Sequence, residues 1–533
     1  MGKRILAYGA ASVIAAGLLL PTTAATQSQA TLQSPALELD RDRTPVSSSL
    51  SWRPCRSGFL ASQGADCARL RVPLNYDRPD GKKITLALSR VRNRVKPSAY
   101  QGVMLVNPGG PGGEGRPWST LGSFLPNRVA KTYDWIGFDP RGVGASRPAL
   151  RCDRNYFGFN RPDYLPIPVE NRDAWFKRTS NYARDCKKKN GKLLSHMTTV
   201  DSARDMDSIR RALGVSKINF YGFSYGTYLG QTYSTLFPQR VRRQVFDSNV
   251  NPRRAFYEAN LDQDTGFQKA FELWFDWIAK YQSLYKLGST GAEVNETFVQ
   301  TQAQLAASPA GGKIGPSEWI DIFLSVGYNT SSWENLATAF SQYVRKGRSQ
   351  PLIQAYRDSG NFDDDNSYAV YTGVQCSDAP WPRKWSTWAD DNWATFEVAP
   401  LMTWANAWFN YPCRYWPVKT AKRFKVKDKG VPPILLVSGT LDAPTPYKGS
   451  EVVRKIFKRS RLLAIDGEVG HAVSVDGNRC VEKVVTRYLL DGGLPKRKNA
   501  GGADVSCSAA PLPNPLSDLE AKSEPELQVP QKR

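Results

Sequence analysis

A serine lies at the centre of a short glycine-flanked motif that could perform nucleophilic chemistry. Ser224 is the middle residue of Gly222-Phe-Ser-Tyr-Gly226; an apolar, strand-like run precedes it and a helical pattern follows it. A serine at the apex of a sharp strand-to-helix turn needs neighbours without Cβ atoms, because the chain must double back while the hydroxyl stays exposed. The setting therefore predicts a nucleophilic serine.

A serine hydroxyl needs a neighbouring base, and the chain contains only two histidines. His471 lies in the glycine-flanked loop Gly467-Glu-Val-Gly-His-Ala-Val473, after the last strand that we expect. His196 precedes the helix that leads to the serine, where a base is not expected. We therefore predict that His471 is the general base and that His196 has a surface or capping role.

An acid must hold the imidazole in the correct tautomer and stabilise its charged form. Asp442 follows a buried strand, at the end of Val437-Ser-Gly-Thr-Leu-Asp442. The order serine, acid, histidine is the one that hydrolases with this type of serine turn require. We predict Asp442 as the acid, with Asp466 as the alternative, although Asp466 is awkwardly close to His471 in sequence.

A glycine-rich loop follows an early strand and could bind a developing oxyanion. It reads Asn107-Pro-Gly-Gly-Pro-Gly-Gly113, and its glycines would let the backbone approach a substrate closely. Oxyanions of acyl transfer are bound by backbone N–H groups, of which one usually belongs to the residue after the nucleophile. We predict Gly110 and Tyr225 as the two donors.

The elements that must position these residues alternate between strands and helices. We expect strands at 70–74, 84–91, 103–106, 135–138, 433–439 and 461–465, and an amphipathic helix from Thr199 to Leu213. Thr199 or Asp201 would cap this helix and Gly214 would end it. A further helix is expected at 480–490. Such alternation predicts an α/β fold with a doubly wound, mostly parallel sheet.

A change of composition divides the chain. Residues 251–418 contain eleven of the fifteen tryptophans and interrupt the sheet, which predicts a helical cap over the site. The core would then comprise residues 51–250 and 419–508. Residues 31–50 are expected to be a linker, and residues 509–533 a disordered tail rich in proline and charge.

The N-terminus and the cysteines indicate export. Residues 1–30 have the pattern of a secretory signal peptide, and no later run is apolar for long enough to span a membrane. We therefore expect a secreted protein without stable membrane insertion. Its eight cysteines allow 105 disulfide connectivities, and we expect the pairing of nearest neighbours because short loops cost least to close: Cys55–Cys67, Cys152–Cys186, Cys376–Cys413 and Cys480–Cys507. We expect neither a metal site nor a cofactor.

The net charge of +23 raises the question of a nucleic-acid partner. The basic runs are scattered, and none accompanies a nucleic-acid-binding motif. We therefore exclude nucleic acid and expect a solvated basic surface that could associate with an anionic cell envelope.

Three motifs together resemble those of the secreted tripeptidyl and prolyl aminopeptidases of actinobacteria, which are α/β-hydrolases related to proline iminopeptidase. They are the loop 107–113, Phe138-Asp-Pro-Arg-Gly-Val-Gly-Ala-Ser146 and the turn around Ser224; Tyr488-Leu-Leu-Asp-Gly-Gly-Leu-Pro495, followed by Cys507, resembles the C-terminal module of that family. The resemblance covers roughly residues 50–508. It implies a serine exopeptidase that removes short units, tripeptides first among them, from free peptide N-termini.

The sequence departs from the family pattern at two places, and the predicted reaction also requires a group that binds the substrate's amine. Glu114 stands where the family has a small residue, and Asp247-Ser-Asn249 replaces its Asp-Gly pair. An aminopeptidase must bind a cationic α-amine, and a buried cation needs an anionic partner. Asp378, near a cysteine of the cap, and Glu114 are the predicted amine-binding residues.

Two other functions are compatible with the same residues. An esterase or lipase could use the same triad beneath an aromatic cap, because function depends on the pocket and not on the scaffold. A non-catalytic binding protein on a hydrolase scaffold is the third hypothesis. Blocking by N-acetylation of a peptide distinguishes the first two, and labelling of Ser224 by a fluorophosphonate excludes the third.

Overall fold

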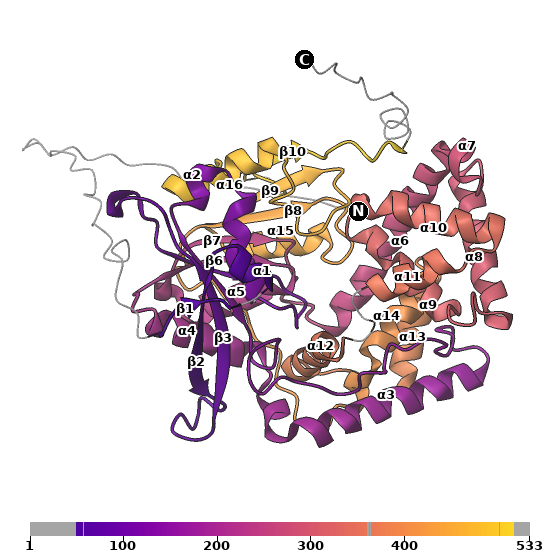
Figure 1. Cartoon of the computed structure of the whole chain (residues 1–533), viewed down its shortest axis with the longest axis horizontal. Helices are drawn as coiled ribbons and strands as arrows, with labels where there is room; N and C mark the ends of the chain where they lie inside the picture. The colour runs from indigo at the N-terminus through magenta and orange to yellow at the C-terminus, as the bar shows by residue number, and fades with distance from the viewer. Residues whose placement is uncertain (1–49, 57, 360–361, 363, 500, 516–533) are drawn as a thin grey trace, which may run out of the picture. The chain divides into compact units, whose positions relative to one another are not determined.

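A ten-stranded sheet forms the centre of the protein (Figure 1). The computed structural model describes residues 50–515 except 57, 360–361, 363 and 500, so the predicted signal peptide and nearly all of the predicted linker lie outside the described residues. The strands are β1 (Arg53–Pro54), β2 (Asp66–Pro73), β3 (Lys83–Val91), β4 (Val103–Asn107), β5 (Asp134–Asp139), β6 (Ile218–Phe223), β7 (Val241–Asp247), β8 (Ile434–Gly439), β9 (Arg461–Asp466) and β10 (Val505–Ser508).

The order of the strands is β1-β2-β3-β5-β4-β6-β7-β8-β9-β10. The pairs among β1, β2, β3 and β5 are antiparallel, and every other neighbouring pair is parallel. Alternate side chains of β4 enter two different cores, because Leu105 joins one buried cluster while Met104 and Val106 join the other. Both faces of the sheet are therefore covered, which confirms the predicted doubly wound α/β fold.

Sixteen α-helices occur among the described residues. Those that pack on the sheet or lie near it are α1 (Gly58–Ser62), α2 (Asn127–Ala130), α4 (Thr199–Ala212), α5 (Tyr225–Leu236), α15 (Tyr447–Ile456) and α16 (Arg479–Asp491). The N-terminal cap of α4 is Thr198, whose hydroxyl accepts from Asp201 N, and not Thr199 or Asp201 as predicted. Gly214 follows the helix with φ +72°, as the sequence predicts.

Helices dominate the segment between β7 and β8. They are α6 (Tyr257–Lys280), α7 (Gln282–Tyr285), α8 (Gly291–Ala307), α9 (Pro316–Phe323), α10 (Trp333–Lys346), α11 (Gln350–Asp358), α12 (Asp365–Asp378), α13 (Trp385–Phe396) and α14 (Thr403–Asn410). Their interior is aromatic, and Trp274, Trp319 and Trp333 are fully buried. We call this helical segment, residues 251–418, the cap.

A second segment, which the sequence analysis did not predict, packs against the cap. Helix α3 (Val169–Asn190) runs beneath the cap helices in Figure 1 and stacks Trp175 on Trp408 of α14, with 5.8 Å between the ring centroids. Charged residues make up much of α3, and its sparse apolar positions hid the helical period. The cap is therefore joined by a segment from the first half of the chain.

The C-terminal part differs from the prediction in two ways. Strand β9 is followed by β10, which pairs with it in parallel. Residues 509–513 also contact the protein, because Ala509 N donates to Asp466 O (3.0 Å) and Trp277 Nε1 donates to Pro513 O (2.9 Å). The ordered part thus extends past the predicted boundary of the tail at residue 509; residues 516–533 lie outside the described part of the chain.

All four predicted disulfides are present, so the nearest-neighbour pairing is confirmed. Cys480–Cys507 joins α16 to β10, and Cys376–Cys413 closes a loop within the cap. Among the described residues, no helix is both long and apolar enough to cross a bilayer.

Candidate active site

Ser224 occupies a sharp turn between β6 and α5. Its φ of 55° and ψ of −127° put a non-glycine residue at positive φ, a region that such residues seldom adopt. A Cβ atom on Gly222 would lie 2.6 Å from Gly226 O, and one on Gly226 would lie 2.6 Å from Asn107 O. The two flanking glycines are therefore required by close backbone contacts, as the motif predicts.

The predicted base and the predicted acid are in contact. His471 Nδ1 lies 2.9 Å from Asp442 Oδ1 and 3.1 Å from Asp442 Oδ2. Thr445 also holds the carboxylate, because its backbone N–H donates to Oδ1 and its hydroxyl donates to Oδ2, both at 2.9 Å. The alternative acid, Asp466, is exposed at the end of β9.

The environment of His471 favours its charged form. Burial by itself would lower the pKa of His471, but the charge of Asp442 and its hydrogen bond raise the pKa above the ordinary value. The ring also packs edge-on against Tyr328 of the cap, at 5.5 Å between ring centroids, and His471 N donates to Tyr328 O (2.8 Å). The cap thus contacts the histidine loop directly.

The predicted oxyanion loop packs on the serine turn. A Cβ atom on Gly109 would lie 2.5 Å from Phe223 O and 2.9 Å from Ser224 Cβ. Tyr225 is the first residue of α5, so its N–H has no acceptor within that helix. Gly110 N likewise has no acceptor among the described residues, whereas Gly113 N donates to Gly109 O.

A large cavity is lined by residues of both the core and the cap. Its volume is about 1270 Å³, and both Gly110 and Ser224 line it together with residues of α6, α9, α11, α12 and α14. Tyr225 and Tyr328 also contribute to its wall. A cavity of this size can enclose a substrate of several residues.

Neither predicted amine-binding residue lines this cavity. The carboxylate of Asp378 accepts hydrogen bonds from the backbone N–H and the hydroxyl of Thr199, at the start of α4. Burial raises the pKa of Asp378 to about 7. Glu114 is exposed and lies close to Gly144. Asp378 thus satisfies the first N–H of α4, and neither side chain is part of the cavity wall.

A different carboxylate belongs to the cavity wall. Asp321 of α9 accepts from Arg161 Nη2 (2.6 Å) and from the hydroxyl of Tyr164 (2.9 Å). Arg161 also donates to the fully buried Glu318, from Nε at 2.9 Å. The signal that the sequence analysis missed is an acid inside the apolar run Trp319-Ile-Asp-Ile-Phe323.

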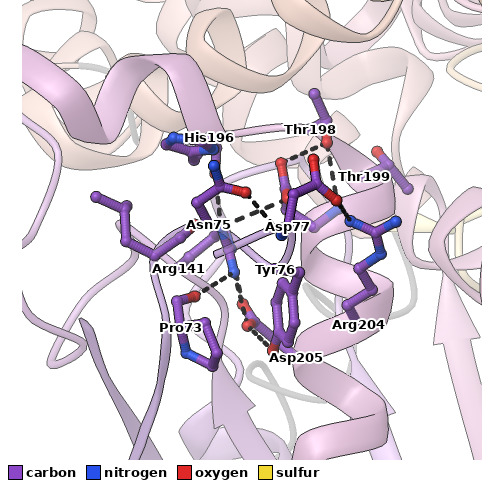
Figure 2. A network of polar contacts seen from close by, with 12 residues as sticks. Pro73, Asn75, Tyr76, Asp77, Arg141, His196, Thr198, Thr199, Arg204 and Asp205 are labelled. Atoms are coloured by element: carbon purple, nitrogen blue, oxygen red, sulfur yellow. Dashed lines mark hydrogen bonds and ion pairs between the residues drawn. The ribbon is translucent and has the colours of Figure 1, made fainter. Parts of the chain in front are cut away.

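The motif at 138–146 serves a network that positions α4 (Figure 2). Arg141 is fully buried and makes a two-pronged ion pair with Asp205, from Nε at 2.8 Å and from Nη2 at 2.7 Å. Its Nη1 donates to the backbone oxygens of Leu74 and His196. His196 thus contributes its carbonyl to this network, and α4 begins shortly after it.

The comparisons with known proteins agree with this architecture. The profile of the α/β-hydrolase fold family matches residues 102–477. The tripeptidyl aminopeptidase of Streptomyces coelicolor is 42% identical over 479 residues, which cover 87% of this chain and 87% of that protein.

Two mycobacterial relatives also align over most of the chain. The serine protease Hip1 of Mycobacterium tuberculosis is 34% identical over 477 residues, covering 84% of this chain and 89% of that protein. The carboxylesterase B of the same organism is 30% identical over 474 residues, covering 84% of this chain and 88% of that protein. The chain therefore belongs to the α/β-hydrolase family, in the branch that holds these tripeptidyl aminopeptidases and serine proteases, and it is a serine hydrolase.

Proposed function

We propose that the protein is an exported serine exopeptidase that releases short units, tripeptides first among them, from peptides with a free N-terminus. The observation that carries this proposal is a cavity whose wall includes the candidate nucleophile Ser224 and the partly buried carboxylate of Asp321. A nucleophile and an anionic group on the wall of one cavity suit a substrate with a scissile amide and a cationic end. The identity with a tripeptidyl aminopeptidase supports the same substrate class.

The proposed reaction uses Ser224, His471 and Asp442 as a triad. Ser224 Oγ attacks the scissile carbonyl while His471 Nε2 takes the hydroxyl proton, and Asp442 holds the Nδ1 side of the ring. The N–H groups of Gly110 and Tyr225 donate to the oxyanion of the tetrahedral intermediate. The imidazolium then protonates the leaving amine, and water hydrolyses the acyl-enzyme by the reverse sequence of proton transfers.

The proposed partner of the substrate's α-ammonium group is Asp321. One guanidinium, that of Arg161, lies between the two carboxylates of Glu318 and Asp321, so the cluster carries an excess negative charge. Burial raises the pKa of Asp321, and the charge of Arg161 and the hydrogen bonds from Tyr164 and Arg161 only partly offset this effect. An ammonium group of the substrate would supply further compensation.

The experiment that tests the proposal uses chromogenic substrates of one, two and three residues, each with a free or an acetylated N-terminus. Cleavage confined to the free-amine tripeptides is the expected result. Ser224→Ala should abolish turnover and leave folding intact, and KM should rise above about pH 8, where the α-amine loses its proton. Cleavage that ignores acetylation would refute exopeptidase action.

Asp321→Asn tests the amine partner separately. KM for the free-amine tripeptide should rise roughly tenfold or more, which corresponds to the loss of a charge-assisted hydrogen bond. Asp358→Asn is the matched control, because Asp358 lines the same cavity but is exposed. Equal KM values for both variants would exclude Asp321 as the amine partner.

An esterase is the second candidate function. The observation that favours it is the 30% identity to a carboxylesterase B, together with a cavity wall that contains Tyr368, Tyr371 and Phe409. Faster hydrolysis of simple acyl esters than of any tripeptide would support this function.

The four disulfides support the proposed export, because such bonds persist in oxidising compartments. The charge of +23 supports an association with an anionic cell envelope. Release of the protein from envelope fractions by salt would test that association.

A further inference from the structure

The turn at the end of β7 connects the two halves of the candidate catalytic machinery. Asp247 O accepts from Ser224 N at 2.9 Å, and Asp247 Oδ2 accepts from Ser474 N at 2.7 Å. The next residue, Ser248, accepts at its hydroxyl from Ala472 N at 2.8 Å. One dipeptide thus holds the serine turn through its backbone and the histidine loop through two side chains.

The proposed reaction does not use these two residues, and both are fully buried. Ser248 has φ +62°, a conformation that is strained for serine and unstrained for glycine. A glycine could therefore form the same turn at less cost but could not accept the hydrogen bond from Ala472. The hydrogen bond from Ala472 N to Ser248 Oγ is therefore what a serine provides here and a glycine would not.

Asp247 also places a second carboxylate near His471. Burial raises the pKa of Asp247 to about 6, and its charge raises the pKa of His471. The other ionisable groups facing Asp247 are Asp442 and the hydroxyl of Tyr221, which hydrogen-bonds to Ser474. Above about pH 6, the imidazolium of His471 therefore has two carboxylates nearby and contacts only one of them.

We infer that Asp247 and Ser248 are positioning residues that hold Ser224 and His471 in register and add negative charge behind the imidazole. The inference rests on the proposed roles of Ser224 and His471, which Ser224→Ala tests separately. It concerns the triad and not the substrate, so it holds equally for peptide and ester hydrolysis.

Ser248→Gly tests the positioning. Glycine can adopt the same backbone conformation, but it lacks the CH2OH group and with it the hydrogen bond from Ala472 N and the hydroxyl's donation to Asp247 Oδ1 (3.3 Å), so kcat should fall roughly tenfold with KM unchanged. A merely structural role predicts instead that kcat does not fall, because glycine relieves the backbone strain at this φ. Lys286→Gly is the control, since Lys286 is exposed in the cap at φ +54°. Wild-type kcat in Ser248→Gly would overturn the positioning role.

Asp247→Asn tests the charge, because an asparagine Oδ1 can still accept from Ser474 N. The acid limb of kcat/KM should move to lower pH by about half a unit to one unit, since the pKa of His471 loses a raising influence. An acid limb that stays in place would overturn the electrostatic part. If Asp247→Asn does not fold, the outcome for Ser248→Gly decides the inference alone.

Discussion

His471 is buried against Asp442 and Tyr328, and its surroundings determine how the activity should depend on pH. The pKa of His471 is raised above the ordinary value of about 6.5, and only the neutral imidazole can accept the serine proton. We expect the acid limb of kcat/KM for a free-amine tripeptide to lie above pH 6.5, with activity falling as the pH decreases through it. A pH–rate profile measures this directly, and a limb at or below that pH would contradict the geometry.

Asp378 gives a second prediction about a single residue. Its folded-state pKa of about 7 exceeds the unfolded value of about 3.9, so the stability associated with its neutral form is complete below about pH 4. That stability is lost as the pH rises from about 4 to 7, because the buried carboxylate ionises.

Asp378→Asn removes this ionisation and keeps an acceptor for Thr199 N. The variant should show a higher Tm than the wild type at pH 8, a similar Tm at pH 4, and wild-type KM. Scanning fluorimetry across pH 4–8 and steady-state kinetics check both parts. A selective rise in KM for free-amine substrates would instead restore Asp378 as an amine-binding residue.

At the scale of elements, the contact between the loop 107–113 and the serine turn should be sensitive to a single methyl group. Gly109→Ala places a Cβ atom 2.5 Å from Phe223 O and forces φ +99° on an alanine. We expect kcat to fall on the order of 100-fold, the usual effect of displacing an oxyanion donor.

Gly312→Ala is the matched control for Gly109→Ala. It has φ +67° and no atom within 4 Å of the added Cβ, so it tests backbone strain alone. Its kcat should equal that of the wild type, while both variants lose some stability in thermal unfolding. Equal kcat values in Gly109→Ala and the wild type would separate this loop from catalysis.

Elements with a strong local pattern were predictable, and weakly patterned ones were not. A reader of the sequence can recognise the continuous apolar runs of β4, β6 and β8. The amphipathic face of α4 can be recognised too, because its apolar residues recur at helical spacing. Helix α3 carries few apolar residues, and β10 has only Val-Ser-Cys-Ser, so neither can be recognised from its own residues. Both elements form because a neighbour in space, the cap or β9, supplies the partner surface.

At the scale of the whole molecule, the disulfides fix segments whose own packing is slight. Cys480–Cys507 spans 27 residues and holds the four-residue strand β10 beside β9. Replacing both cysteines with alanine should lower the free energy of unfolding by about 3–4 kcal/mol, as loop-closure entropy predicts. Chemical denaturation under oxidising conditions measures the loss, and a loss below about 1 kcal/mol would contradict this role.

The sequence by itself determined the α/β class and the residues that we assign to the triad, because each depends on a local pattern or on chain order. For the disulfides it favoured nearest-neighbour pairing, which the structure then confirmed. The contact of His471 with Asp442 then follows from adjacent parallel strands whose carboxyl ends meet at one edge of a sheet. Only the tertiary structure decided which carboxylates line the cavity.

Arg161 meets Glu318 across 157 residues, and Asp378 meets Thr199 across 179, so neither role can be seen in a local pattern. A buried carboxylate must find a donor wherever the fold brings one. The packing of the cap therefore makes Asp378 an acceptor for the first N–H of α4 and leaves Asp321 on the cavity wall.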